Sequence, residues 1–145
     1  MGYPVDINKY PVSTPYGKKG PMWSGNVHKG VDQACPKGTQ VVAPIDGKVI
    51  AAGLLGWGPA FGRHQVIIEF KGKRNPLLPT KTYWVILAHM SADSVNVGDV
   101  VKKGQPIGKS GAEGNVTGPH IHMEVHTTRI WGSKSYINPD FVIKA

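Results

Sequence analysis

Hydrophobic positions along this chain fall into short runs rather than into long helical periods. Residues 41–45 (VVAPI) and 48–52 (KVIAA) are β-prone and are separated by Asp46-Gly47. An Asp-Gly pair between two such runs is a strong hairpin signal, because glycine tolerates the positive φ that the turn requires. Residues 65–70 and 82–87 are almost wholly apolar. Such runs are typical of strands that are buried on both faces of a sheet.

The rest of the chain alternates short strands with irregular connections. Residues 95–108 are predicted to form short strands interrupted by glycines, and residues 120–126 alternate strictly between polar and apolar side chains. Residues 53–63 are predicted to be a loop, and residues 1–27 an irregular arm that packs on the rest. The pattern predicts a mostly β fold: residues 1–145 form a single domain, an antiparallel β-sheet with long loops and little helix.

The composition supports this fold class. Glycine and proline make up 31 of the 145 residues, roughly a fifth of the chain. The average usage is about 12%, so this excess favours tight turns over helix bundles. The one cysteine, Cys35, excludes an internal disulfide framework and every cysteine-rich zinc module. A metal site in this chain would have to be built from histidine and carboxylate ligands.

The net charge and the length of the apolar runs indicate which classes of binding partner to expect. A formal net charge of +8 favours polyanionic partners such as anionic wall polymers. The basic residues are dispersed and no nucleic-acid-binding motif occurs, so we interpret the charge as steering or solubility and predict no nucleic-acid partner. No apolar run approaches the roughly 20 residues of a membrane span, and the first residues lack the apolar core of a secretory signal. We therefore expect no membrane span and no signal peptide, and the oligomeric state stays open.

The sharpest chemical feature is the strand predicted over residues 120–126. Alternation puts His120, His122, Glu124 and His126 on one face and apolar side chains on the core-facing side. Histidines two positions apart lie about 7 Å apart along a strand, which suits one metal ligand and one neighbouring base better than two ligands. A solvated polar face that happens to hold histidines is the alternative interpretation.

Two other segments offer ligands. His28 and Asp32 are four positions apart, and a regular strand of that length spans about 13 Å, too far for one metal ion. The segment must therefore bend, and Gly30 is the residue expected to permit the bend. His89 follows the apolar run 82–87 and is expected at the end of that strand, where a side chain either caps an edge or lines a site. A catalytic zinc site takes three protein ligands and a water. His28, Asp32 and one histidine of the pair His120 and His122 would supply the three protein ligands.

The order of these motifs resembles the lysostaphin-type (LytM-like) zinc metalloendopeptidases, which cut peptidoglycan peptides. The connecting segments match as well, in PKGTQVVAPIDGKVIAAG, YWVILAHMS, VGDVVKKGQPIGKSG, TGPHIHMEV and INPDF, and the match runs from about residue 11 to residue 142. Two departures occur. Gln33 stands where the family usually has an apolar residue, and the loop 57–63 does not align.

The resemblance implies that His28, Asp32 and His122 bind one Zn²⁺ ion per chain. His120 and His89 are then the two metal-free histidines beside a zinc-activated water that attacks the peptide bond. We expect His120 to be the general base, because an imidazole accepts a proton near neutral pH. His89 is expected to stabilise the oxyanion or to protonate the leaving amine, and at this point the two roles are interchangeable.

Other polar residues have smaller predicted roles. Glu124 is a candidate for supporting a ligand imidazole from behind, with a solvated side chain as the alternative. His126 and His64 are expected at the surface or at a strand edge. Cys35 is expected to be a buried thiol rather than a ligand.

The resulting hypothesis is a zinc metalloendopeptidase that hydrolyses stem or cross-bridge peptides of bacterial cell-wall peptidoglycan, a bacteriolytic and therefore antimicrobial hydrolase. The segment PYGKKGPMWSGNVHKGVD resembles phage lysins. A phage endolysin would act from the host cytoplasm on the cell wall, whereas a trimmed bacterial or phage-tail domain would act outside the cell.

Two competing hypotheses remain. The first is a non-catalytic wall-binding domain of the same fold. The second is a biotinyl or lipoyl carrier module, because VGDVVKKGQPIG resembles such domains, although Asp46-Gly47-Lys48 lacks the lysine pattern that their hairpin tip needs.

Overall fold

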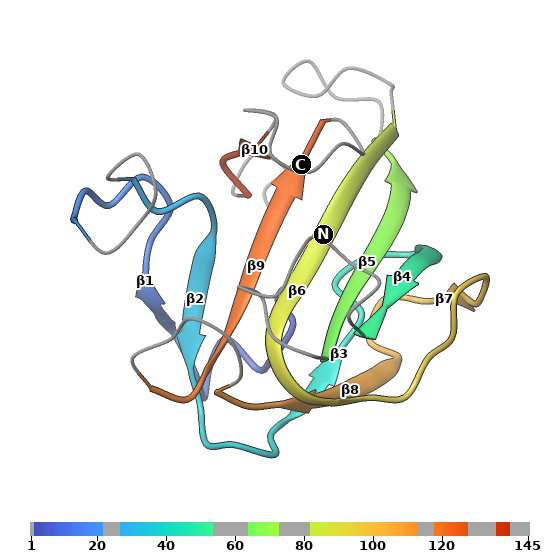
Figure 1. Ribbon diagram of the computed structural model, residues 1–145, viewed down its shortest axis with the longest axis horizontal. Coiled ribbons are helices and arrows are strands. Elements are labelled where there is room, and N and C mark those ends of the chain that lie inside the picture. Colours follow the sequence, from blue (N-terminus) through green and yellow to red (C-terminus); the bar gives the residue numbers. More distant parts are fainter. Residues whose placement is uncertain are drawn as a thin grey trace.

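The computed structural model describes residues 2–21, 27–53, 64–72, 82–112, 118–127 and 136–139 (Figure 1). These residues form one ten-stranded sheet and contain no α-helix, which confirms the predicted mostly β, antiparallel fold. No helix among them is long and apolar enough to cross a membrane. The loop predicted over 53–63 lies outside the described residues, apart from Gly53. The strands are β1 (Val12–Thr14), β2 (Val31–Ala34), β3 (Gln40–Val42), β4 (Gly47–Ala52), β5 (His64–Lys71), β6 (Thr82–Asp93), β7 (Val100–Val101), β8 (Pro106–Ser110), β9 (His120–His126) and β10 (Tyr136–Ile137).

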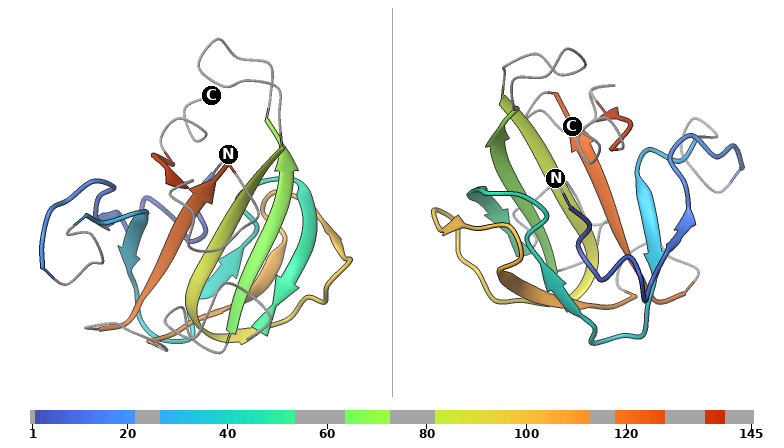
Figure 2. Two further views of the ribbon diagram at one scale, coloured as in Figure 1. Left: turned by 45° about the horizontal axis from the view of Figure 1, so that its top comes forward. Right: turned by 180° about the vertical axis from the view of Figure 1, so that it is seen from behind.

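The strand order places β9 inside the sheet. Neighbouring strands follow the order β1-β2-β9-β6-β5-β4-β7, while β8 leaves this path to pair with the end of β6 and with β3. Figure 2 shows how the long strands twist and how β8 runs across one end of them. The histidine-rich strand predicted over 120–126 is β9, and it has β2 on one side and β6 on the other.

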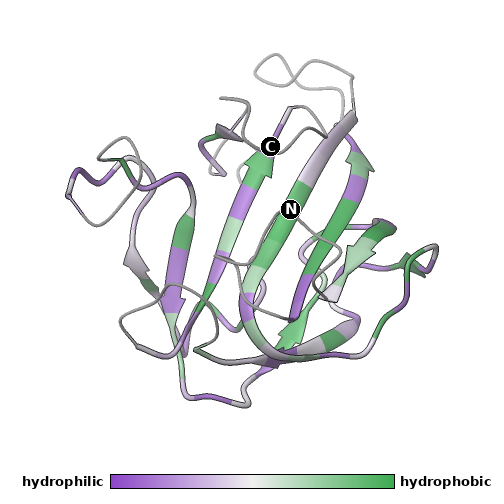
Figure 3. Ribbon diagram, in the orientation of Figure 1, coloured by the Kyte–Doolittle hydropathy of each residue, from purple (hydrophilic) through white to green (hydrophobic). Residues whose placement is uncertain are grey.

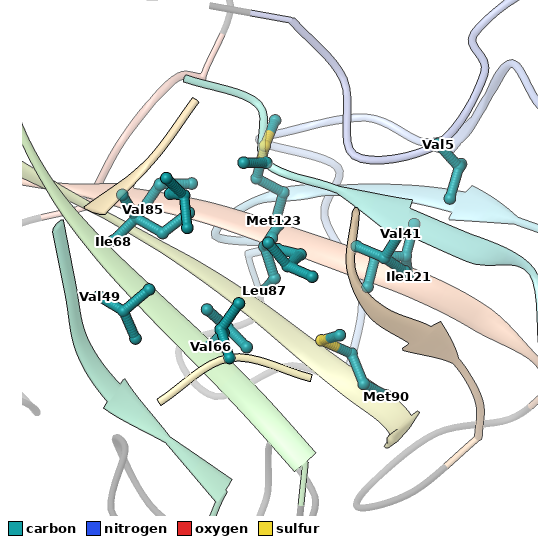
Figure 4. Packing of buried hydrophobic residues seen from close by; sticks show 14 of the residues in the cluster. Val5, Val41, Val49, Val66, Ile68, Val85, Leu87, Met90, Ile121 and Met123 are labelled. Atoms are coloured by element: carbon teal, nitrogen blue, oxygen red, sulfur yellow. The ribbon is translucent and has the colours of Figure 1, made fainter. Parts of the chain in front are cut away.

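The main core lies between the long strands and the β3–β8 pair. Aliphatic and methionine side chains of β5, β6 and β9 pack there against Val41 of β3 (Figure 4), in a cluster that also contains Ile107 of β8. A smaller cluster contains Ala51, Ile67 and Ile86. Because consecutive side chains of a strand point to opposite faces, β5 and β6 contribute to both clusters, as predicted for strands buried on both faces. Figure 3 shows the hydrophobic residues concentrated along these two strands.

The hairpin predicted at Asp46-Gly47 is wrong. β3 pairs with β8 rather than with β4, and β4 pairs with β5 and β7. Gly47 does not have a positive φ; a side chain there would instead collide with the backbone of Glu69 on β5. Asp46 accepts the backbone N–H of Lys103 at 2.7 Å. The pair therefore marks a close approach of strands and a side-chain cap, not a two-residue turn.

The prediction that a strand ends at His89 is also wrong. β6 continues to Asp93 and changes neighbours on the way: Ala88 pairs with His122 of β9, and Met90 pairs with Ser110 of β8. The φ of His89 is 64°, a left-handed conformation that costs a non-glycine residue about 1–3 kcal/mol. The strained residue is thus the point at which β6 leaves the plane of β9.

The N-terminal arm is held by a buried glutamine. Gln33 is 1% exposed, and its side-chain nitrogen donates to the carbonyls of Val5 at 3.3 Å and Tyr10 at 2.7 Å. The arm also contains β1, which pairs with β2, so it is not wholly irregular. These bonds explain why a polar residue occupies a position at which an apolar one was expected.

Gln33→Met is therefore expected to destabilise the protein by about 1–3 kcal/mol, because the carbonyls of Val5 and Tyr10 lose their donor. Urea denaturation followed by circular dichroism measures the effect. Gln40→Met, at an exposed position of β3, is the matched control and should stay within about 0.5 kcal/mol of the unmodified protein. Equal stability of the two variants would contradict the role given to Gln33.

Candidate metal centre

Three side chains meet where β2 and β9 lie side by side. Asp32 on β2 pairs directly with His122 on β9, and His28 lies just before β2. Each residue offers one possible ligand atom, and these atoms lie within 4.8 Å of one another. The relative exposures of His28, Asp32 and His122 are 2%, 9% and 7%. The structure thus brings together the three residues that the resemblance implied as zinc ligands.

Each of the two imidazoles has one nitrogen held from behind and the other turned toward Asp32. His28 Nδ1 donates to the carbonyl of Pro15 at 3.0 Å, and its Nε2 lies 3.2 Å from Asp32 Oδ2. His122 Nε2 donates to Glu124 Oε1 at 2.8 Å, and its Nδ1 lies 2.6 Å from Asp32 Oδ1. Two imidazoles anchored in this way and one carboxylate are a donor set typical of catalytic zinc sites, which keep a fourth position open. The residues present therefore fit one zinc ion.

Gly30 permits this convergence, but by a different route from the one expected. Its φ is not positive. A side chain at this position would overlap the carbonyl oxygen of Met123, and would come within 2.9 Å of both Glu124 Cγ and His122 Cε1. Gly30 is thus the position at which the chain passes too close to β9 for any side chain.

The two other predicted histidines lie beside the metal centre. His120 Nδ1 donates to the carbonyl of Gly118 at 2.9 Å, and its Nε2 lies 3.6 Å from Asp32 Oδ1. The ring centroid of His89 lies 5.1 Å from that of His120 and 5.8 Å from that of His122. Both side chains are therefore near enough to act on a substrate bound at the metal, although neither belongs to the group of candidate ligands.

Paired buried groups dominate the electrostatics of the centre. Burial by itself would raise the pKa of Asp32, but hydrogen bonds from His122 and His28 outweigh it and hold that pKa well below its usual range. Burial would lower the pKa of His122, but hydrogen bonds to Asp32 and Glu124 raise it to about 9. Hydrogen bonds from His122 and His126 likewise lower the pKa of Glu124 to about 2, against the effect of burial. In metal-free protein at neutral pH, His122 is a cation between two carboxylates.

Zinc binding is therefore expected to release about one proton per chain at pH 7, because a ligand imidazole must be neutral. With the pKa of His122 near 9, zinc affinity should rise about tenfold per pH unit from pH 7 and level off above that pKa. Calorimetric titration of metal-free protein in buffers of different ionisation enthalpy counts the protons. Zinc uptake without proton release, or an affinity that is flat from pH 7 to 9, would contradict this coupling.

The predicted positions of His126, His64 and Cys35 agree only in part with the structure. His126 was expected at the surface or an edge, but it is 6% exposed and donates from Nε2 to Glu124 Oε2 at 2.7 Å. Alternation identifies which residues share a face and not whether that face is covered. His64 pairs with Asp93 at 2.6 Å and its side chain is 36% exposed, which agrees with the surface alternative of its predicted surface or strand-edge position. Cys35 is buried in the main core, as predicted.

Two contributors to the site escaped the sequence analysis. The Pro15 carbonyl that anchors His28 is a backbone atom, and no residue type marks it. Gly111 accepts the N–H of His120 at 3.1 Å, and a side chain on it would come within 3.0 Å of the His89 carbonyl oxygen. A glycine next to Ser110 in a loop-like segment gave no signal of this close contact.

Comparison with known proteins agrees with the geometry. The profile of Peptidase family M23 matches residues 26–139. Lysostaphin of Staphylococcus staphylolyticus is 36% identical over 119 residues, which cover 81% of this chain and 22% of that protein. Peptidoglycan DD-endopeptidase ShyB of Vibrio cholerae is 35% identical over 130 residues, which cover 82% of this chain and 27% of that protein. The chain thus spans only about a quarter of the length of these curated relatives.

Among solved structures, the catalytic domain of lysostaphin from Staphylococcus simulans has a TM-score of 0.76 and 30% identity, with 96% of each chain covered. The predicted fold and the predicted resemblance to this peptidase family are therefore confirmed. The sequence match, the shared fold and the His-Asp-His group together show that this chain belongs to peptidase family M23.

Proposed function

We propose that this domain hydrolyses peptide bonds of bacterial peptidoglycan, using one zinc ion held by His28, Asp32 and His122. The observation that carries the proposal is the convergence of two buried imidazoles and one carboxylate within 4.8 Å, next to two further histidines. The substrate class is supported by the names of two relatives, a peptidoglycan DD-endopeptidase and a glycyl-glycine endopeptidase.

The residues around the centre have distinct tasks in such a reaction. Zinc, when bound, polarises the scissile carbonyl and lowers the pKa of a coordinated water. His120 accepts the proton of the attacking water through Nε2, and the bond from Nδ1 to Gly118 fixes the ring for this task. His89, whose ring meets that of His120 in a T-shaped contact, donates a hydrogen bond to the developing oxyanion or a proton to the leaving amine. The reverse assignment of the two histidines is the alternative.

Mass spectrometry of fragments released from defined cell walls tests the proposal. Walls with glycine cross-bridges and walls with direct stem-peptide links are incubated with the protein, with chelator, and with zinc added back. Zinc-dependent release of fragments that end at one class of bond is expected, either glycyl-glycine or D-alanyl to diamino acid. Binding to both walls without release of any fragment would favour the non-catalytic wall-binding alternative. The carrier-module alternative is weakened further, because Asp46-Gly47 does not form the hairpin tip that such a module needs.

The net charge of +8 supports an accessory attraction to anionic wall polymers. Binding of the protein to whole walls should then weaken as added salt shortens the Debye length, which is about 10 Å at 0.1 M. A wall affinity that is the same at low and high salt would contradict this part of the proposal.

The biological setting is a separate part of the proposal. The resemblance of residues 15–32 to phage lysins supports a lysin that accumulates in the host cytoplasm and then attacks the cell wall. Lysis of host cells only when the protein is expressed together with a membrane pore protein is the expected result. Lysis from outside alone would favour a bacterial or phage-tail origin.

The N-terminal arm belongs to the same functional unit in this proposal. The Pro15 carbonyl lies in the arm and anchors His28, and Gln33 fastens the arm to β2. The single-domain prediction for residues 1–145 is thus supported by contacts that tie the arm to the candidate metal centre.

A further inference from the structure

A buried row of hydrogen-bonded side chains extends the metal centre along β9. Glu124 is 5% exposed. Its two carboxylate oxygens accept one hydrogen bond each, from His122 Nε2 at 2.8 Å and from His126 Nε2 at 2.7 Å. The three side chains share a face because residues two apart in a strand point the same way. One carboxylate therefore joins the metal-facing imidazole of His122 to a second imidazole farther along the strand.

Apolar and aromatic residues surround this row. On β6, Ile86 pairs with Glu124 and is fully buried, and Trp84 pairs with His126. On β10, Tyr136 pairs with His126, and their ring centroids lie 6.4 Å apart. A carboxylate in such surroundings is costly unless it is hydrogen-bonded. The two imidazoles supply those bonds, so the charge of Glu124 is held in place by the row itself.

The hydrogen bond from His122 to Glu124 determines which nitrogen of His122 faces Asp32. An ionised carboxylate only accepts hydrogen bonds, so Nε2 keeps its hydrogen toward Glu124, and the proton that His122 must lose to become a ligand leaves from Nδ1. Nδ1 is the atom that lies 2.6 Å from Asp32 Oδ1. Gly30 leaves the room that this arrangement needs, since a side chain there would press on both Glu124 Cγ and His122 Cε1.

We propose that Glu124 is a positioning residue of the metal centre and that His126 is its support. Glu124 holds Nδ1 of His122 toward the ion. His126 donates a hydrogen bond to the second carboxylate oxygen of Glu124 and so keeps the carboxylate from rotating away from His122. The inference rests on the zinc site of the proposed function. The inference concerns how tightly the metal is held, and it does not depend on which peptide bond the domain cuts.

Zinc affinity, measured by competition with a chromophoric chelator, tests the proposal directly. Glu124→Ala is expected to weaken zinc binding by about 10–100-fold, the usual effect of removing an outer partner of a metal-ligating histidine. Glu124→Gln should restore most of the affinity, because the amide oxygen still accepts from His122 Nε2. His126→Phe should give a smaller loss than Glu124→Ala. In protein loaded with Co²⁺, the visible spectrum of Glu124→Ala should differ from that of the unmodified protein, and the spectrum of Glu124→Gln should be the same.

Glu69→Ala is the matched control. Glu69 lies on the same face of the sheet, on β5, and accepts a hydrogen bond from Trp84 Nε1 at 3.0 Å. Its removal also deletes a part-buried carboxylate, but it should leave zinc affinity and the Co²⁺ spectrum unchanged. Thermal unfolding of the metal-free forms shows how much stability each variant has lost.

Several outcomes would overturn the proposal. They are an unchanged zinc affinity in Glu124→Ala, an equal loss in Glu69→Ala, and a loss in Glu124→Gln as large as in Glu124→Ala. Should Glu124→Ala fail to fold, His126→Phe decides: weaker zinc binding supports the proposal and unchanged binding overturns it. Because none of these measurements uses a substrate, their failure is distinguishable from a failure to cut peptidoglycan.

Discussion

Asp32→Ala is expected to remove zinc and peptidase activity together. Asp32 is the only carboxylate in the candidate ligand group found among the described residues. Its oxygens lie 2.6 Å from His122 Nδ1 and 3.2 Å from His28 Nε2. Without it, two buried imidazoles face each other with no anionic ligand, so the loss of zinc affinity should exceed the roughly 10–100-fold cost of removing an outer partner. Elemental analysis of zinc per chain and the release of wall fragments measure the two effects.

Asp93→Ala provides the matched control for this prediction. Asp93 also pairs with a histidine, His64, at 2.6 Å, but neither residue belongs to the candidate ligand group. This variant is expected to keep its zinc and its activity. A full complement of zinc in Asp32→Ala would mean that another side chain supplies the third ligand, and the site would have to be reassigned.

His120→Ala is expected to keep zinc and to lose turnover. The His120 Nε2 lies 3.6 Å from Asp32 Oδ1, beside the ligand group rather than within it. A general acid or base contributes typically about 10²–10⁴-fold to a rate, so kcat should fall by that order while the zinc content stays at one ion per chain. Zinc analysis and fragment release on the same sample separate the two effects.

His64→Ala controls for the loss of an imidazole elsewhere, because His64 is partly exposed and outside the site. It should leave both the zinc content and kcat near those of the unmodified protein. Loss of metal in His120→Ala would instead make His120 a ligand. His89→Ala distinguishes the two catalytic roles: the variant that lacks the base should lose the acidic limb of the pH–rate profile, and the other should retain it.

The strand that carries most of the chemistry is readable from local pattern alone. Strict alternation over residues 120–126 predicts the full extent of β9 and the sharing of one face by His122 and Glu124, because the side-chain period of a strand does not depend on its neighbours. The burial of that face follows from the flanking strands β2 and β6. It is therefore invisible to alternation, and this is why His126 was expected at a surface or an edge.

Local signals failed where distant segments imposed the geometry. Asp46-Gly47 has the composition of a tight turn, yet β5 and the backbone of Lys103 determine its conformation. His89 follows an apolar run that would end a strand, yet β8 pairs with the residues beyond it and extends β6 to Asp93. In both places a tertiary pairing outweighs the short-range preference, and at His89 the cross-strand hydrogen bonds offset an unfavourable left-handed conformation.

The amino-acid sequence by itself determined the β character of the chain, the two faces of β9 and the kinds of donor available for a metal: imidazole and carboxylate without cysteine thiolate. Only the tertiary structure decided that Asp32 and His122, 90 positions apart, lie opposite each other. It also decided that the Pro15 carbonyl and Glu124 select the nitrogens that face the centre. The physical reason is that side-chain periodicity is a property of a few consecutive residues, whereas the placement of ligand atoms within 4.8 Å depends on how whole strands pair and twist.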